Sequence, residues 1–195
     1  PVGVGSGKST VGLMFQLLGV PVYNADDRAK YLTVFDQKLK QSIIAAFGEA
    51  AYDGDALNRT YMARQVFADK EKLAKLNSLI HPRVAEDFNS WVTANNDQPY
   101  LLKEAALIFE TRGNLKLDKV ITVTASEKTR IERVLQRDKH RTAADIHKII
   151  SNQLPEQTKV DLSDFVIEND GEHMVIPQVL VIHKGLTVLS QNQAT

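Results

Sequence analysis

The spacing of apolar residues at the start of the chain predicts a helix followed by a short strand. One helical face, at positions i, i+3, i+4 and i+7, is formed by Val11, Met14, Phe15 and Leu18. Gly19 is placed to end this helix, and the apolar run 20–23 predicts a buried strand that leads into Asp26. A helix followed by such a strand is typical of an α/β unit.

The segment 27–95 carries apolar residues almost entirely at helical spacing. Helices are predicted at 39–47, 59–67, 70–80 and 82–92, with a turn at 52–55. The last two are predicted as separate helices because proline, here Pro82, is favoured at the first position of a helix. So long a helical stretch exceeds a simple crossover between strands, and it predicts a helical subdomain inserted into the α/β fold.

Strands and helices alternate again in the second half of the chain. Strands are predicted at 100–109, 120–124 and 165–167, and helices at 127–137, about 142–152 and in the remainder through 189. Leu154-Pro155 is expected to stop the middle helix. This alternation predicts an α/β fold with a parallel sheet flanked by helices.

Residues 3–10 read G-V-G-S-G-K-S-T directly before the first predicted helix. This is the phosphate-binding part of a P-loop, in which glycines let backbone N–H groups surround a polyphosphate. Lys8 is predicted to reach the β- and γ-phosphate oxygens and Ser9 to hold Mg²⁺, at the positive end of the helix. A glycine-rich helix start is the alternative, but the pattern coincides with the helix that the motif requires. The complete pattern has glycine at the position of Val2 and a strand before it, so we expect residues upstream of Pro1.

Composition narrows the class of protein. The 195 residues are 43% hydrophobic and 25% charged with a formal net charge of zero, as in a globular chain with a real core. A neutral chain has no global field for nucleic acid or anionic lipid, and no apolar run reaches the roughly 18 residues of a membrane span. The lack of cysteine excludes disulfides and thiolate chemistry, and the five histidines show no metal-ligand spacing. We expect a single domain, residues 1–195, in the cytoplasm, with small-molecule partners and no nucleic acid or membrane.

Acidic residues follow two of the predicted strands. Asp26 lies just past the strand at 20–23, and Glu110 just past the strand at 100–109. Because ligands of parallel sheets bind at the carboxyl ends of strands, both acids are expected at the edge that carries the P-loop. Asp26 can accept a proton from, or orient, a hydroxyl that attacks the γ-phosphate. Capping of the next helix by Asp26 or Asp27 explains the same pattern, and at this point both interpretations stay open.

Basic residues concentrate in the segment 128–148, which carries seven lysines and arginines against three acidic residues. A mobile arginine-rich flap that closes over ATP is what phosphoryl transfer needs. We assign Arg137 and Arg141 to such a flap. Lys128 and Arg130 are interpreted instead as part of a solvated helix face.

An ordered set of short motifs runs through almost the whole chain. It consists of G-V-G-S-G-K-S-T, Gly19-Val20-Pro21-Val22 leading to Ala25-Asp26, Leu57-Asn58-Arg59, Val66-Phe67, Ile80-His81-Pro82, Leu107-Ile108-Phe109-Glu110, Arg137-Asp138 and Val166-Ile167-Glu168-Asn169-Asp170-Gly171. In this order the motifs resemble the dephospho-CoA kinase family. The P-loop is shared by many families, whereas the His-Pro pair and the late I-E-N-D-G are far more specific.

The resemblance implies ATP-dependent phosphorylation of the ribose 3′-hydroxyl of dephospho-CoA, giving CoA and ADP in the last step of coenzyme A synthesis. It implies a P-loop kinase fold with three layers, a central parallel sheet, an inserted helical substrate subdomain and a helical lid, using ATP and Mg²⁺. The core would cover about residues 1–26, 98–128 and 160–195, the helical CoA subdomain about 27–97 and the lid about 129–159.

The same resemblance assigns roles to individual side chains. Asp26 matches the catalytic aspartate of the family, which favours a general base over a helix cap, and Lys8 and the lid residue Arg137 complete the expected catalytic set. The residues expected to bind ATP are Gly3, Gly5, Ser6, Gly7, Lys8, Ser9, Thr10, Arg137, Asn169 and Gly171, with Ser9 also the metal ligand. Residues at acceptor-side positions are Asp26, Arg59, His81 and Glu110.

Three positions depart from the family pattern, and the first is Pro1-Val2 in place of the usual Thr-Gly. Asn24 stands where many members have an aspartate, and Lys103-Glu104 interrupts a strand that is more apolar in the family. Glu104 is either a partner of the Mg²⁺ site or one half of a buried pair with Lys103. No apolar run ending in aspartate supplies a further metal ligand.

Two other functions fit a P-loop chain. The first is another small-molecule kinase, acting on a nucleoside monophosphate or a sugar acid, although the helical insert and His81-Pro82 favour the CoA precursor. The second is a nucleotide-dependent switch or binding module. A GTPase would need an N-K-x-D motif, which the sequence lacks, and a transporter-type ATPase a signature sequence and a longer chain.

Overall fold

The computed structural model describes residues 4–67 and 69–193, so Gly3 of the predicted ATP site lies outside the described residues. The chain forms two compact units, Pro1–Val22 with Asp97–Thr195 (the first unit) and Tyr23–Asn96 (the second unit). The helical subdomain predicted at about 27–97 covers nearly the same segment as the second unit. Its role in holding substrate stays a prediction.

A parallel strand pair forms part of the first unit. In β5 (Ile121–Thr124) and β6 (Phe165–Glu168), Ile121 lies opposite Phe165 and Thr124 opposite Glu168. The Asn169 N–H extends the pairing by donating to the Thr124 carbonyl over 2.8 Å. These two strands confirm the predicted β-branched strand and the short strand before the I-E-N-D-G motif.

Another strand of the first unit is much shorter than predicted. β4 covers only Leu102–Glu104 and pairs with β1 (Val22–Asn24), and the Leu102 N–H donates to the Pro21 carbonyl over 3.0 Å. The predicted strand at 100–109 is therefore wrong over its second half. Ile108 and Phe109 lie in turns and pack with Val120 in a small separate cluster, so these two residues are buried without being extended.

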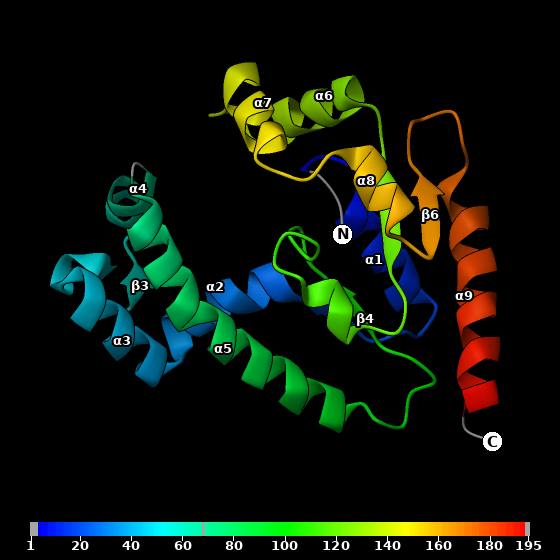
Figure 1. Cartoon of the computed structure of the whole chain (residues 1–195), viewed down its shortest axis with the longest axis horizontal. Helices are drawn as coiled ribbons and strands as arrows, with labels where there is room; N and C mark the ends of the chain where they lie inside the picture. The colour runs from blue at the N-terminus through cyan, green and yellow to red at the C-terminus, as the bar shows by residue number, and fades with distance from the viewer. Residues whose placement is uncertain (1–3, 68, 194–195) are drawn as a thin grey trace. The chain divides into compact units, whose positions relative to one another are not determined.

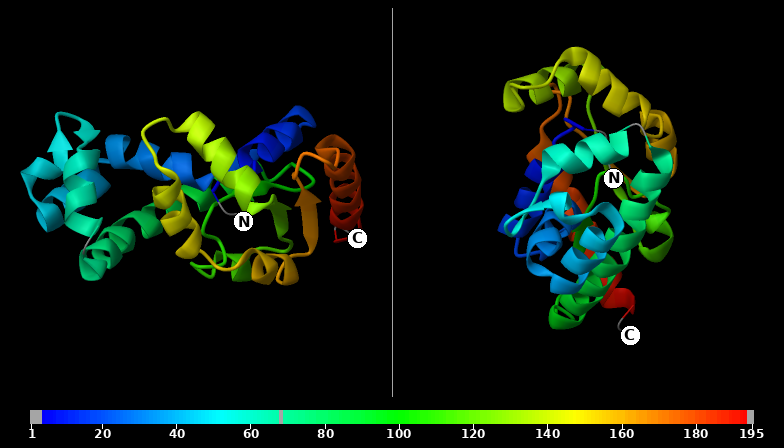
Figure 2. Two further views of the ribbon diagram at one scale, coloured as in Figure 1. Left: turned by 90° about the horizontal axis from the view of Figure 1, so that it is seen from above. Right: turned by 90° about the vertical axis from the view of Figure 1, so that its left-hand side faces the viewer.

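The main core of the first unit lies where two helices meet the strands. α1 (Lys8–Leu17) contacts α9 (Val175–Gln193), and α9 runs beside β6 in Figure 1 and in the left view of Figure 2. The buried residues of this core are Val11, Phe15, Val20, Val123, Ile167, Val179 and Ile182. The predicted apolar face of the first helix is confirmed at Val11 and Phe15, and Gly19 follows the helix with a φ of 85°.

Three helices lie between β5 and β6 in the sequence: α6 (Glu127–Arg137), α7 (Ala143–Ser151) and α8 (Glu156–Asp161). Side-chain caps set the starts of the first two, because Ser126 accepts a hydrogen bond from the Thr129 N–H and Thr142 forms a capping box with Asp145. Both helices agree with the sequence prediction, whereas α8 was not predicted. A 3₁₀ turn covers Gly113–Lys116.

The second unit is mainly helical. It contains α2 (Ala25–Phe35), α3 (Gln37–Phe47), a 3₁₀ turn at Glu49–Ala51, a hairpin of β2 (Tyr52–Asp53) and β3 (Ala56–Leu57), α4 (Arg59–Phe67) and α5 (Lys70–Ala94). Its own core consists of Leu32, Leu39, Ile43, Phe47, Ala51 and Met62. The predicted helical character of this segment is confirmed. The turn predicted at 52–55 falls on the hairpin, whose turn residues are Gly54 and Asp55, whereas Tyr52 and Asp53 form β2.

α5 corrects the predicted boundary at Pro82. The helix runs without interruption through Pro82, although proline cannot donate the interior hydrogen bond and its ring crowds the preceding turn. Packing on both sides of the proline outweighs this cost, since Leu79 before it and Val84 after it both pack on the core of the second unit. The Arg83 guanidinium also donates to Asp36, the N-cap of α3, over 2.6 Å.

Within the described ranges 4–67 and 69–193, we find no helix with the length and apolar character needed to cross a membrane.

Candidate active site

The P-loop is folded as a turn that only glycine fits at two positions. Gly5 and Gly7 have φ angles of 83° and 94°, the left-handed region that favours glycine. A Cβ on Gly5 would lie 2.4 Å from the Arg130 carbonyl oxygen, and a Cβ on Gly7 would lie 2.2 Å from Asn169 Nδ2. α1 begins directly after this turn at Lys8 with no side-chain cap, so the free N–H groups of its first turn can bind an anion.

A buried carboxylate from β4 meets the first two residues of α1. Ser9 Oγ donates to Glu104 Oε1 over 2.6 Å, and the Lys8 ammonium lies 3.6 Å from the same oxygen. The Glu104 side chain is only 9% exposed, so this carboxylate is held at the P-loop rather than in solvent. Glu104 therefore lies at the phosphate site with two partners that the sequence did not indicate, and its role toward Mg²⁺ stays a prediction.

Arg130 lies against the P-loop, which corrects its assignment to a solvated helix face. Its side chain is 6% exposed. Nε donates to the Val4 carbonyl over 3.1 Å, and Nη1 donates to Glu156 of α8 over 2.6 Å. The apolar periodicity of α6 could not indicate this, because the surface that buries Arg130 comes from segments far away in the sequence.

Arg133 and Asn169 also contact the P-loop, at the carbonyl of Ser6. Asn169 Nδ2 donates to the Ser6 carbonyl over 2.8 Å, and Arg133 Nη1 approaches the same oxygen at 3.5 Å. Arg133 Nη2 donates to Asn169 Oδ1 over 3.3 Å. Asn169 was predicted from the family resemblance, whereas Arg133 was not singled out.

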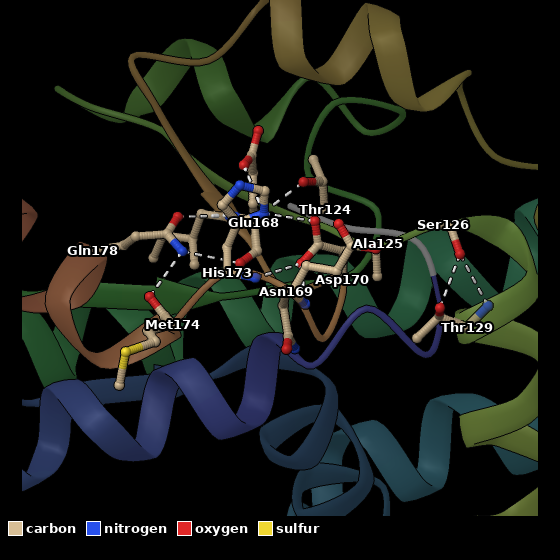
Figure 3. Close-up of polar contacts among 12 residues, drawn as sticks. Thr124, Ala125, Ser126, Thr129, Glu168, Asn169, Asp170, His173, Met174 and Gln178 are labelled. Carbon is tan, nitrogen blue, oxygen red and sulfur yellow. Dashed lines mark hydrogen bonds and ion pairs between the residues drawn. The ribbon is translucent and has the colours of Figure 1, made fainter.

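The loop after β6 is held by its own side chains (Figure 3). His173 Nδ1 lies 2.7 Å from Asp170 Oδ2 and 3.3 Å from Glu168 Oε2. The hydrogen bond to Asp170 raises the pKa of His173, and the N–H and side chain of His173 lower the pKa of Asp170 well below its usual value. Gln178 of α9 donates to the Glu168 carbonyl over 3.0 Å, which ties the loop to that helix. Gly171 lies in this loop with a φ of 97°.

Glu110 is engaged by the segment that follows α7. Its Oε1 accepts hydrogen bonds from the Leu154 N–H and from Lys159 Nζ, each over 3.0 Å, and Lys159 is 2% exposed. Burial would raise the pKa of Glu110, but these hydrogen bonds outweigh it and hold the pKa below its usual value. An acceptor-side role for Glu110 stays a prediction, and it would require Glu110 to serve substrate while it holds Lys159.

The predicted flap arginines pair with one acid; Arg137 is exposed and Arg141 is half-buried. Arg137 is 66% exposed, and its Nε and Nη2 both donate to the carboxylate of Asp138 over 2.9 Å. Arg141 Nε lies 3.3 Å from Asp138. Arg137 therefore presents its guanidinium at the surface of the first unit, and its role in catalysis stays a prediction.

Three predicted residues, Asp26, Arg59 and His81, lie in the second unit, and all three are exposed. Asp26 is in the first turn of α2, but the N-cap is Asn24, whose side chain accepts a hydrogen bond from the Asp27 N–H over 3.0 Å. The capping alternative for Asp26 is therefore wrong, and its carboxylate has no hydrogen-bond partner among residues 4–67 and 69–193.

Comparison with known proteins supplies the family. The sequence profile of the dephospho-CoA kinase family matches residues 2–174. The chain belongs to the dephospho-CoA kinase family. A dephospho-CoA kinase of Bacteroides fragilis is 33% identical over 178 residues, which cover 91% of this chain and 86% of the relative. One of Chlorobaculum tepidum is 38% identical over 176 residues, covering 87% and 84%.

Solved structures agree in fold. The crystal structure of TT1252 from Thermus thermophilus aligns with a TM-score of 0.81 at 28% identity, covering 97% of this chain and 94% of that one. Dephospho-CoA kinase from Campylobacter jejuni aligns with a TM-score of 0.68 at 20% identity, covering 95% and 94%, which supports the fold alone. The predicted α/β fold of P-loop kinase type is confirmed.

In this member of the dephospho-CoA kinase family, the first unit thus assembles one compact set of groups around the P-loop. It consists of Gly5, Ser6, Gly7, Lys8, Ser9, Glu104, Arg130, Arg133 and Asn169. Sequence reasoning missed Arg133 altogether and left Glu104 undecided. The one available signal for Glu104 was a carboxylate at the end of a short apolar run, where strands of this fold deliver ligand-binding groups.

Proposed function

We propose that this chain transfers the γ-phosphoryl group of ATP to the ribose 3′-hydroxyl of dephospho-CoA, giving CoA and ADP. The observation that carries the proposal is the glycine turn that leads into α1, with Lys8 and Ser9 gathered on the buried carboxylate of Glu104. Membership of the dephospho-CoA kinase family supplies the acceptor and the use of ATP.

The P-loop binds the triphosphate through its backbone. The free N–H groups at the start of α1 and the Lys8 ammonium neutralise the β- and γ-phosphate oxygens, where charge grows during transfer. Gly5 and Gly7 carry no side chain on the side where Arg130 and Asn169 pack, so these two residues can lie directly against the turn.

The donors beside Lys8 fit Mg²⁺. The Ser9 hydroxyl and the Glu104 carboxylate are hard oxygen donors that already lie within 2.6 Å of each other. Ser9 would hold the metal, with the Glu104 carboxylate beside it. A metal held there would supply positive charge that offsets the charge of the phosphate oxygens.

Asp26 is proposed to act on the acceptor. Its carboxylate is exposed at the start of α2 and does not cap the helix, because Asn24 is the N-cap. A carboxylate in this state can accept the proton of the ribose hydroxyl as it attacks phosphorus. Arg137 is proposed to exchange Asp138 for phosphate oxygens, and Arg59, His81 and Glu110 to contact the acceptor.

The experiment that tests the proposal compares acceptors. Purified protein is mixed with Mg²⁺, ATP and either dephospho-CoA, AMP or gluconate, and ADP formation is followed by a coupled assay. We expect turnover with dephospho-CoA at least about 10²-fold above the other two acceptors, since a site built for one acceptor's polar groups rejects an analogue that lacks them. Turnover of AMP or gluconate without dephospho-CoA would show a different small-molecule kinase. ATP binding with no transfer to any acceptor would favour the binding module.

The cytoplasmic location expected from the sequence is part of this proposal, because ATP and the CoA precursor are soluble metabolites.

A further inference from the structure

Ser6 contributes a carbonyl to the P-loop directly before Gly7, the N-cap of α1. The Ser6 carbonyl oxygen accepts a hydrogen bond from Asn169 Nδ2 over 2.8 Å, and Ser6 is only 1% exposed. The peptide that carries the carbonyl also carries the N–H of Gly7, so fixing the oxygen fixes the direction of that N–H. A donor on the Ser6 carbonyl therefore controls part of the anion-binding turn.

The Asn169 amide is engaged by the protein at both ends. Nδ2 donates to Ser6, and Oδ1 accepts from Arg133 Nη2 over 3.3 Å. A flipped amide would place Oδ1 against the Ser6 carbonyl and Nδ2 against the guanidinium, two repulsive contacts. In Figure 3 the Asn169 side chain points toward the dark blue ribbon that leads into α1, away from the His173 ring.

The neighbouring backbone leaves little room for other arrangements. Asn169 Nδ2 occupies the space that a side chain on Gly7 would need, with only 2.2 Å to a Cβ there. The Asn169 N–H is fixed as well, because it donates to the Thr124 carbonyl at the end of β5. Arg133 supplies one guanidinium that reaches both the Ser6 carbonyl and the Asn169 amide.

From these contacts we infer that Arg133 is a positioning residue, which acts on the Ser6 carbonyl directly and through Asn169 to orient the Ser6–Gly7 peptide for phosphate binding. The inference rests on the proposed function only in taking the P-loop as a polyphosphate site. It also gives the Asn169 side chain a task at the P-loop instead of the direct nucleotide contact expected from the family resemblance.

Binding of two probes, one with and one without a base, tests this inference. Affinities for ADP and for inorganic tripolyphosphate, each with Mg²⁺, are measured by titration calorimetry for the wild type, Arg133→Met, Asn169→Ala and the double variant. We expect each single variant to lower the affinity for both probes by the same factor, about tenfold. This is the usual loss when one charge-assisted hydrogen bond is removed. The double variant should lose clearly less than the product of the two single losses, because Arg133 acts in part through Asn169.

Controls keep the test independent of folding and of total charge. Lys128→Met removes an exposed positive charge from the same helix and should leave both affinities unchanged. Arg133→Lys keeps the charge but loses the two-pronged geometry, so it should resemble Arg133→Met. Variants are compared only where their circular dichroism and thermal midpoints match the wild type. If the other variants do not fold, the affinities of the most conservative variant, Arg133→Lys, are compared with those of the wild type.

Three results would overturn the inference. Loss of ADP affinity with unchanged tripolyphosphate affinity would make Asn169 or Arg133 a contact to the base. Independent, additive losses in the double variant would mean that Arg133 does not act through Asn169. Wild-type affinity in Arg133→Lys would mean that charge alone matters. None of the readouts uses an acceptor, so failure of dephospho-CoA as substrate would leave this test intact.

Discussion

Lys8 carries the clearest prediction for a single side chain. Its ammonium is held 3.6 Å from Glu104 at the start of α1, where the γ-phosphate is expected. Lys8→Ala should lower kcat by about 10²–10³-fold, the usual loss when one preorganised charge stabiliser is removed. Steady-state kinetics with dephospho-CoA measures it, with Lys128→Met as the charge control. Near-normal turnover would remove Lys8 from the mechanism.

Asp26 is tested by separating binding from turnover. Asp26→Asn should abolish most of kcat while ATP still binds, because the carboxylate acts on the acceptor hydroxyl and not on the nucleotide. Asp27→Asn, one residue along the same exposed turn of α2, is the matched control and should retain activity. A higher KM for ATP with unchanged kcat would make Asp26 a binding residue instead.

His173 offers a pH-dependent test of the loop after β6. Its pKa is raised above 6.5 by the hydrogen bond to Asp170, whose own pKa is lowered below 3.8. The pair therefore stabilises the fold fully between these two ordinary values. The stabilisation disappears as pH rises through the raised pKa of His173, or falls through the lowered pKa of Asp170.

NMR titration of the histidine ring signals measures this effect. The signal that vanishes in His173→Gln should titrate above pH 6.5 in the wild type and move toward the ordinary histidine range in Asp170→Asn. An unchanged midpoint in Asp170→Asn would show that the pair does not set the protonation of His173.

Residues of the site differ in how far the sequence could predict them. Lys8 and Ser9 belong to a contiguous motif whose spacing carries its own chemistry, so they could be named directly. Arg130 and Arg133 could not, because nothing in the α6 sequence distinguishes an arginine that reaches the P-loop from one that faces water. Arg137 shows the reverse case: the sequence placed it at the site, and in the structure it is exposed and paired with Asp138.

Among the helices and strands, ends that are set by local capping were predicted correctly. Ends that depend on tertiary packing were predicted wrongly. α6 begins and ends where predicted, because Ser126 caps it and its own periodicity defines its face. The apolar run 100–109 was misread because burial alone does not distinguish a strand from a buried turn. The helix boundary at Pro82 was misplaced because packing around Leu79 and Val84 overrides the local preference of proline.

Pro82 gives a stability prediction for α5. Pro82→Ala restores an interior N–H and removes the ring from the preceding turn, while it frees the unfolded chain slightly. The exposed position leaves room for the change, so the free energy of unfolding should rise by about 1–2 kcal/mol. Urea denaturation measures it, with Ala85→Ser in the same helix as a reference. A lower free energy of unfolding would show that the proline is fitted to a bend that α5 needs.

For the whole molecule, two separate apolar cores explain why the organisation was readable from the sequence. Val11, Phe15 and Ile167 lie in the core of the first unit, whereas Leu39, Ile43 and Met62 lie in that of the second. When a segment buries its own apolar residues, their helical spacing alone predicts an inserted helical unit. The grouping of Glu104, Arg133 and Asn169 at the P-loop depends instead on how the strands and helices of the first unit fold together.

The identity of the product tests the central claim most directly. Protein, Mg²⁺, ATP and dephospho-CoA are incubated, and the product is examined by mass spectrometry and phosphorus NMR beside authentic CoA. We predict one added phosphoryl group, attached to the ribose 3′-oxygen, and about 10²–10³-fold less of this product from Lys8→Ala in the same time. A phosphoryl group at another oxygen, or ATP consumed with dephospho-CoA unchanged, would contradict the account.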